Sequence, residues 1–197
     1  MSEDKTTLEE ILFNNLVMEW NRKQNLVSRK KTDVFDLIED SKMFFNYIKF
    51  YDGIKIIDIG TGGGFPGIPI RIHHKEAKLT LVDSTRKKAD AVRNIIDKMN
   101  YNDVEVVWNR AENLEKEEKF RNKFDYVVSR SVASLFNLTK WSRHLLKEGG
   151  KLITIKGGDI SEEIAKTKRQ EFLKAIETEV VAERVAIVIE FRNILEL

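Results

Sequence analysis

A cluster of glycines at residues 60–67 follows a short apolar run that includes an aspartate, Asp58. Glycine lets the backbone approach a bound molecule closely, because it carries no side chain and adopts conformations that other residues avoid. An apolar run that breaks into glycine and then into a helix is how an α/β domain presents backbone amides to a nucleotide-like ligand. The segment IKIIDIGTGGGFPG, residues 54–67, therefore predicts a ligand site at the end of a buried strand.

Two classes of cofactor use such a loop, and the glycine spacing does not separate them. Counted from Gly60, the G-x-G-x-x-G pattern of dinucleotide sites fails at Phe65, but counted from Gly62 it is satisfied. The carboxylate of Asp58 is more informative, because it would repel the pyrophosphate of a dinucleotide. S-adenosylmethionine instead brings a sulfonium cation and an amino group. We therefore predict a methyltransferase site, with a dinucleotide-binding module that binds NAD as one alternative.

A second carboxylate stands at the end of the next apolar run, LTLVD at residues 79–83. Asp83 lies 23 residues after Gly60, the distance at which a β-α-β unit delivers a carboxylate to ribose hydroxyls. The alternative is that Asp83 only caps the following helix. The strand, the loop and the spacing together favour ribose binding.

Later strands also end in polar or basic residues. Residues 109–113 follow a strand at 104–108, where an adenine ring would lie in such a site. Arg130 comes just after a strand at 124–128, where it could reach a substrate phosphate or the edge of a guanine. Lys156 lies at the mouth of a strand at 151–158. We predict that Arg130 and Lys156 position the substrate.

These strands alternate with helices until a closing hairpin with its turn at Glu183-Arg184, which gives seven strands. The order predicts a Rossmann-like α/β fold of class I methyltransferases, with a mostly parallel sheet and an antiparallel last strand. We expect an N-terminal helical extension at residues 1–52 and a methyltransferase domain at 53–197, together one compact unit. The two helices of the extension should pack as a cap beside the cofactor end.

Several helix boundaries follow from periodicity and capping residues. Thr6 or Thr7 would cap a first helix, and Thr32 or Asp33 a second. A helix at about 134–147 should stop at Gly149-Gly150, and a last helix should run near 160–176. The apolar stripe expected on the first helix is Leu8, Ile11, Leu12, Leu16 and Trp20. Trp141 is interpreted as a core residue rather than as part of a cofactor site.

Composition excludes several kinds of site. The chain has 197 residues, with 34 Lys and Arg against 32 Asp and Glu, so any RNA-binding surface must come from local basic patches. It contains no cysteine, which excludes disulfides and thiolate nucleophiles, and its three scattered histidines predict no metal site. Since no apolar run approaches the length of a membrane span, we expect a soluble, cytoplasmic protein.

Two basic segments are candidates for contact with an anionic partner. Residues 20–31 carry five positive charges, and Arg86, Lys87 and Lys88 open a helix whose start prefers negative charge. Both segments have a plain alternative, a solvated surface. The sharper interpretation is contact with RNA phosphates, for which salt-sensitive binding is expected.

The chain resembles the RsmG/GidB family of bacterial methyltransferases, which modify N7 of one guanine in 16S ribosomal RNA. The resemblance spans roughly residues 20–160 and rests on WNRKQNLVSRK, IEDS, DIGTGGGFPGIPI, LVDSTRKK, RAEN, VVSRSVASL and IKGG. The string GFPGIP is much more specific than a generic glycine loop. Leu37 departs from the family, in which many members have histidine before the Asp-Ser pair, and the first helix and closing hairpin are shorter than usual.

The resemblance implies roles for particular residues. It places Asp83 on the ribose and Arg130 at the junction of cofactor and substrate. It implies S-adenosylmethionine as the cofactor, 16S ribosomal RNA or the small ribosomal subunit as the partner, and no metal. The residues expected to bind the cofactor are Asp58, Gly60, Gly62, Gly64, Phe65, Asp83, Ala111, Glu112 and Arg130.

Guanine N7 carries a lone pair and no proton, so this chemistry needs no general base. In-line displacement on the sulfonium methyl mainly requires positioning. Another RNA or a small molecule as the substrate is the alternative within the same fold. A monomer is expected, since no second apolar face is evident.

Overall fold

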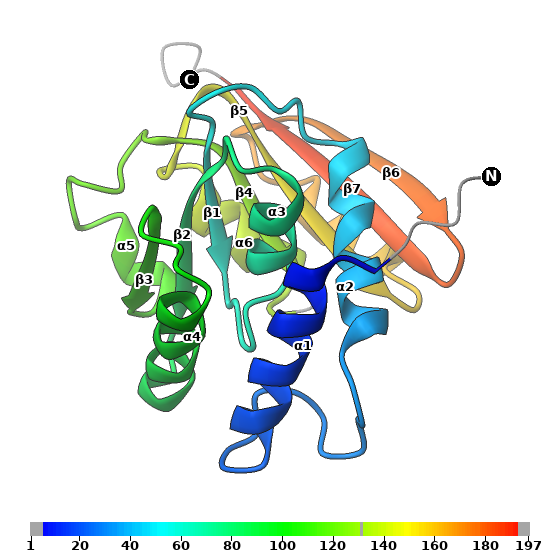
Figure 1. Cartoon of the computed structure of the whole chain (residues 1–197). Helices are drawn as coiled ribbons and strands as arrows, with labels where there is room; N and C mark the ends of the chain where they lie inside the picture. Colours follow the sequence, from blue (N-terminus) through cyan, green and yellow to red (C-terminus); the bar gives the residue numbers. More distant parts are fainter. Residues whose placement is uncertain (1–5, 131, 193–197) are drawn as a thin grey trace.

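The protein is described by a computed structural model that covers residues 6–130 and 132–192. Seven strands form one sheet in the order β3-β2-β1-β4-β5-β7-β6 (Figure 1). All neighbours are parallel except β7, which lies antiparallel between β5 and β6. The predicted mostly parallel sheet with an antiparallel last strand is therefore confirmed. The strands are β1 (Lys55–Ile59), β2 (Lys78–Asp83), β3 (Val104–Trp108), β4 (Phe124–Arg130), β5 (Leu146–Gly157), β6 (Leu173–Val181) and β7 (Arg184–Phe191).

Helices cover both faces of the sheet, because side chains along each strand alternate between two apolar clusters. Ile56 of β1 belongs to one cluster and Ile57 to the other. The first cluster is covered by α1 (Leu8–Asn21), α2 (Phe35–Lys42), the 3₁₀ helix η1 (Met43–Asn46), α3 (Gly67–His73) and α4 (Arg86–Lys98). The second is covered by α5 (Ala111–Leu114), α6 (Leu135–Ser142) and α7 (Ser161–Thr167) (Figure 1).

Helix α1 begins at a capping box, in which Thr7 and Glu10 bond to each other's backbone amides. Its buried apolar side chains are Phe13, Leu16 and Val17. The predicted stripe is therefore wrong at Leu8, Ile11 and Leu12, which are exposed. The face of the helix that carries Phe13 points into the core, because the Phe13 ring packs on the ring of Phe65 in the glycine loop, with 5.1 Å between the ring centroids.

Two predicted helices are too long. Helix α6 ends at Ser142, and Gly149-Gly150 lie inside β5, which begins at Leu146. Sheet pairing decides this boundary, because Leu146 pairs with Phe124 of β4. Helix α7 ends at Thr167, and β6 already begins at Leu173.

The carboxyl ends of β1, β2, β3, β4 and β5 meet at one edge of the sheet, as parallel strands require (Figure 1). The segments that follow these strands therefore lie together although they are far apart in the chain. The loop between α1 and α2 reaches the same edge, where Leu26 and Val27 line a cavity. The N-terminal helices pack on the face that holds α3 and α4, and their connecting loop reaches the predicted cofactor end.

Candidate active site

A cavity of about 370 Å³ opens at the carboxyl edge of the sheet. Its lining includes Gly60, Gly62 and Phe65 of the glycine loop, together with Asp83 and Arg130. The sequence predicted all five as cofactor residues, and the structure brings them together. A larger cavity of about 490 Å³ lies at the opposite edge near the start of β5. We take the smaller one as the candidate site because the predicted chemistry converges there.

The glycine loop is fixed by backbone hydrogen bonds to β2. The amide of Gly60 donates to the carbonyl oxygen of Val82 at 2.8 Å, and the amide of Gly62 donates to the Asp83 carboxylate at 3.0 Å. Gly60, Gly62 and Gly64 all have positive φ angles, of 74°, 58° and 98°. A Cβ atom at Gly60 would lie 2.4 Å from the side chain of Val132. Glycine is thus required at residue 60 both by the conformation and by the close approach.

Asp58 lies beneath this loop instead of in the cavity. Its side chain is fully buried, and its Oδ2 accepts hydrogen bonds from the Thr61 hydroxyl at 2.8 Å and the Gly67 amide at 3.0 Å. Burial raises the pKa of Asp58 to about 7, although these two bonds and the charge of Arg130 act to lower it. The expectation that this carboxylate faces a bound cation directly is corrected: in the structure Asp58 holds the glycine loop against α3.

Asp83 combines a structural contact with exposure to the cavity. Its Oδ2 accepts from Gly62, and its Oδ1 accepts from the Thr85 amide at 2.8 Å. Thr85 is the N-cap residue of α4, so Asp83 also stabilises the start of this helix, as the alternative interpretation of Asp83 expected. The same carboxylate lines the cavity, and each oxygen still has a lone pair for a hydroxyl donor.

A second cavity of about 270 Å³ adjoins the first and shares Gly60, Ser84 and Val132 with it. It is lined by Ala111 and Glu112, where the sequence predicted an adenine ring. Trp141 of α6 also lines it while packing against the second apolar cluster. The sequence interpretation of Trp141 as a core residue was incomplete. Its helical spacing indicated that the side chain points inward, but the spacing could not show that this side chain also borders a cavity.

Arg130, at the end of β4, is held between an aromatic ring and a carboxylate. Its guanidinium carbon lies 5.3 Å from the centroid of the Phe65 ring, and its Nη1 lies 3.8 Å from Oδ2 of Asp40. Arg184, the first residue of β7, donates to the same oxygen of Asp40 at 3.0 Å. Burial lowers the pKa of Arg130 from its ordinary value, while the charges of Asp40 and Asp58 act to raise it.

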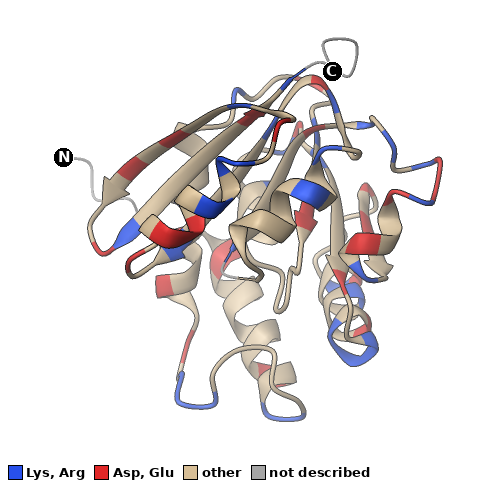
Figure 2. Cartoon of the chain, turned by 180° about the vertical axis from the view of Figure 1, so that it is seen from behind, with Lys and Arg blue, Asp and Glu red and all other residues tan. Residues whose placement is uncertain are grey.

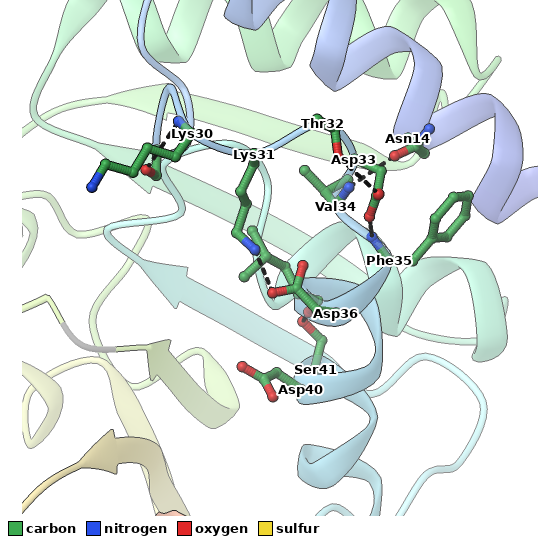
Figure 3. Close-up of polar contacts among 12 residues, drawn as sticks. Asn14, Lys30, Lys31, Thr32, Asp33, Val34, Phe35, Asp36, Asp40 and Ser41 are labelled. Atoms are coloured by element: carbon green, nitrogen blue, oxygen red, sulfur yellow. Dashed lines mark hydrogen bonds and ion pairs between the residues drawn. The ribbon is translucent and has the colours of Figure 1, made fainter.

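Asp40 contacts Arg130 at the site, a role that the sequence analysis did not predict, although Asp40 belongs to the IEDS segment. Figure 3 shows it on α2, close to Ser41 and apart from the contact between Lys31 and Asp36. It joins the N-terminal helices to the ends of β4 and β7 through two arginines. Nothing in the spacing of IEDS indicates partners that lie so far along the chain.

Lys156 is engaged within the protein. Its ammonium group donates to the carbonyl oxygen of Ala133 at 2.8 Å and to Glu163 of α7 at 2.6 Å, and the residue is buried. Burial acts to raise the pKa of Glu163, but hydrogen bonds from Lys156 and from the Leu135 amide outweigh it and lower that pKa. The structure therefore does not support direct contact between Lys156 and the substrate. Lys156 fixes the segment after β4 that contains Ala133.

Family comparison assigns the chain on independent grounds. A model of the family described as rRNA small subunit methyltransferase G matches residues 8–189. The chain belongs to this family. Ribosomal RNA small subunit methyltransferase G of Clostridium novyi is 39% identical over 170 residues, which cover 84% of this chain and 69% of the relative. The enzyme of the same name from Clostridium botulinum is 36% identical over 171 residues, covering 82% of this chain and 68% of the relative.

Solved structures agree on the fold. A putative S-adenosylmethionine-dependent methyltransferase from Methanococcus maripaludis superposes with a TM-score of 0.67 at 17% identity, covering 98% of each chain. The predicted class I methyltransferase fold is confirmed. As a member of the rRNA small subunit methyltransferase G family, the chain is an S-adenosylmethionine-dependent methyltransferase. The cradle above Gly60, the carboxylate of Asp83 and the second cavity fit such a cofactor.

The described residues contain no group of three or more His, Asp or Glu side chains that could hold a metal ion. Within the same ranges, no helix is both long and apolar enough to cross a membrane.

Proposed function

We propose that this protein transfers a methyl group from S-adenosylmethionine to N7 of a guanine in small-subunit (16S) ribosomal RNA. The observation that carries the proposal is the meeting of the glycine loop with Arg130 in one cavity, in a chain of the rRNA small subunit methyltransferase G family. The bound cofactor would supply an electrophilic methyl group. The chain itself would hold the cofactor, orient the base and keep the reacting atoms in line.

In this proposal, the two cavities bind different parts of the cofactor. Asp83 accepts hydrogen bonds from the ribose hydroxyls, and Ala111 and Glu112 contact the adenine beside Trp141. Gly60, Gly62, Gly64 and Phe65 shape the methionine end. Asp58 contributes from below, by keeping the Gly67 amide and the loop in place.

Arg130 acts on the substrate side in this proposal. The guanidinium lies over the Phe65 ring and can still donate N–H groups to guanine O6 or to a phosphate. Guanine N7 has no proton to remove, so we assign no general base. The absence of cysteine from the chain fits this chemistry, because no covalent intermediate on a thiolate is needed.

The partner in the proposal is ribosomal RNA of the small subunit, either free or within the subunit. Single-stranded or irregular RNA suits it, since bases must be splayed out to be recognised. We further propose that the protein acts in the cytoplasm as a monomer, with residues 1–52 as a helical extension of the methyltransferase domain at 53–197.

A labelled-methyl transfer assay tests the proposal. Small ribosomal subunits from a strain that lacks the modification, and protein-free RNA from the same strain, are incubated with the enzyme and labelled S-adenosylmethionine. We expect label on one guanine of the small-subunit RNA, recovered as 7-methylguanine. Label on another base, on another atom of guanine or on neither RNA, with cofactor binding intact, would contradict the proposed substrate.

A further inference from the structure

Trp108 is a large aromatic side chain that the fold leaves in solvent beside the candidate site. It is the last residue of β3, an edge strand, and its exposed fraction is 53%. Its indole N–H donates to the carbonyl oxygen of Ser84 at 3.1 Å, and Ser84 lines both cavities of the site. The ring is therefore fixed at the outer wall of the site and is not packed into the core.

A cation lies over this indole ring. The guanidinium carbon of Arg86 is 5.2 Å from the ring centroid, a distance at which the ring attracts a cation. Arg86 is itself exposed, and its carboxylate partner, Asp90, is 3.8 Å away. An exposed ring beside a guanidinium is the combination with which proteins hold single-stranded nucleic acid, because bases stack on the ring and the cation adds to the contact.

Further positive charges surround this pair. Lys87 and Lys88 follow Arg86 on the first turn of α4, and neither forms an ion pair with a described residue. Gln24, from the loop between α1 and α2, donates to the carbonyl oxygen of Lys87 at 2.6 Å and so ties that basic loop to α4. Figure 2 shows Lys and Arg on the first turn of α4 and at the tips of the loop between α1 and α2.

We propose that Trp108 and Arg86 form a stacking platform for a base of the RNA substrate, outside the cavity that takes the target guanine. Lys87, together with Lys88, which also lines that cavity, holds the flanking phosphates. The partner is single-stranded RNA, because neighbouring lysines at a helix start complement phosphates and an exposed ring accepts any base. The inference rests on the proposed function, of which it specifies one contact. The platform adds affinity for RNA and none for the cofactor.

The experiment measures equilibrium binding of small-subunit RNA and, separately, of S-adenosylmethionine. The variants are Trp108→Ala, Trp108→Phe and, as a matched control, Tyr51→Ala, which removes an exposed aromatic side chain at the opposite edge of the sheet. We expect Trp108→Ala to bind RNA roughly tenfold more weakly and Trp108→Phe to stay within about threefold of the wild type. Tyr51→Ala should leave RNA binding unchanged, and all three variants should keep the cofactor affinity.

Salt dependence separates stacking from charge. The slope of log K against log salt should be unchanged in Trp108→Ala, because an indole ring neutralises no phosphate. The double variant Lys87→Ala/Lys88→Ala should reduce the magnitude of the slope by about 1.4, which is about 0.7 for each single-strand phosphate that is no longer neutralised.

Three results would overturn the platform. They are unchanged RNA binding in Trp108→Ala, an equal loss of cofactor affinity, or a Phe variant as weak as Ala, which would assign the effect to the Ser84 hydrogen bond. Failure of the proposed function is distinguishable, because wild-type protein would then bind RNA through the platform without methylating it.

Discussion

The β1–β2 side and the β4–β5 side of the candidate site are held in place by different interactions. On the first side, backbone amides of the glycine loop donate to the backbone of β2 and to the carboxylate of Asp83, the last residue of that strand. On the second side, Arg130 is oriented by Asp40, and Lys156 by Glu163, through ion pairs between separate elements. We infer that the first side tolerates almost no change in backbone shape, while the second depends on charged partners that could be replaced one at a time.

The largest effect is expected from Gly60→Ala on the first side. Its new methyl group would lie 2.4 Å from Val132, in a left-handed conformation that costs about 1–2 kcal/mol for an L-residue. We expect roughly a hundredfold loss of affinity for S-adenosylmethionine, measured by calorimetry. Gly53→Ala is the matched control, because Gly53 has a similar φ of 76° with no atom within 4 Å of its added Cβ. An equal loss of cofactor affinity in both variants would mean that the close approach of Val132 is irrelevant.

The second prediction concerns Arg130 on the other side. Arg130→Ala should lower methyl transfer to small subunits by roughly a hundredfold, since a charged hydrogen bond is worth about 1.5–3 kcal/mol. Binding of S-adenosylmethionine should fall by roughly threefold or less. Arg130→Lys should restore little, because an ammonium group lacks the planar fork of the guanidinium. Full activity in the Lys variant would argue that only the positive charge matters.

Lys156 provides a third test, because the structure gives it a structural contact where the sequence suggested a substrate contact. Lys156→Met leaves Glu163 without its partner, and we expect a loss of about 1–2 kcal/mol in unfolding free energy, less than for a fully buried pair because Glu163 is partly exposed. The melting temperature should fall by roughly 2–8 °C. Glu163→Gln should cost a similar amount, and the double variant less than the sum. Unchanged stability combined with weaker RNA binding would restore the substrate role.

A smaller effect is expected from Asp40→Asn. The amide removes the charge that faces Arg130 and Arg184 and keeps the shape of the side chain. We expect transfer to fall roughly threefold to tenfold, with affinity for S-adenosylmethionine unchanged. Asp36→Asn on the same helix is the control, since Asp36 pairs with Lys31 (Figure 3). If both variants lose activity equally, the effect belongs to α2 as a whole.

A further prediction concerns the pH dependence of stability. The pKa of Asp58 is raised by burial to about 7, from an ordinary value of 3.8, so the native state holds a proton there that the unfolded chain has already released. Stability from this group is fully present below about pH 4 and is lost as the pH rises towards 7. Relative to Asp58→Asn, the wild type should therefore lose unfolding free energy across this window, as denaturant titrations at several pH values would measure. Parallel curves would show that Asp58 is ionised throughout.

The same contrast explains which parts of the molecule could be predicted from the sequence. The succession of strands along the chain and the residues of the glycine loop are visible as local patterns, so Gly60, Phe65 and Asp83 could be placed at one site, and the structure brings them together. The stop of α6 at Ser142 was missed because a glycine pair looks like a helix end when the pairing of Leu146 with Phe124 is unknown.

Side chains at the site were harder to predict than the backbone. Asp58 lies on the correct strand, but only the three-dimensional loop shows that its carboxylate turns towards Gly67. The partner of Arg130, Asp40, comes from a distant segment, and no spacing rule connects Asp40 with Arg184. Glu163 is only seven residues from Lys156, but the spacing alone does not show that their side chains meet. Trp141 shows the same limit, because its helical period indicated burial and did not show that it borders a cavity.

The most direct test of the division between the two sides is the affinity of S-adenosylmethionine for Gly60→Ala and Arg130→Ala, measured side by side with methyl transfer to small subunits. The account predicts that Gly60→Ala loses cofactor binding and transfer together, whereas Arg130→Ala keeps most cofactor binding and loses transfer. Equal loss of cofactor affinity in both variants would contradict it, because Arg130 would then belong to the cofactor site alone.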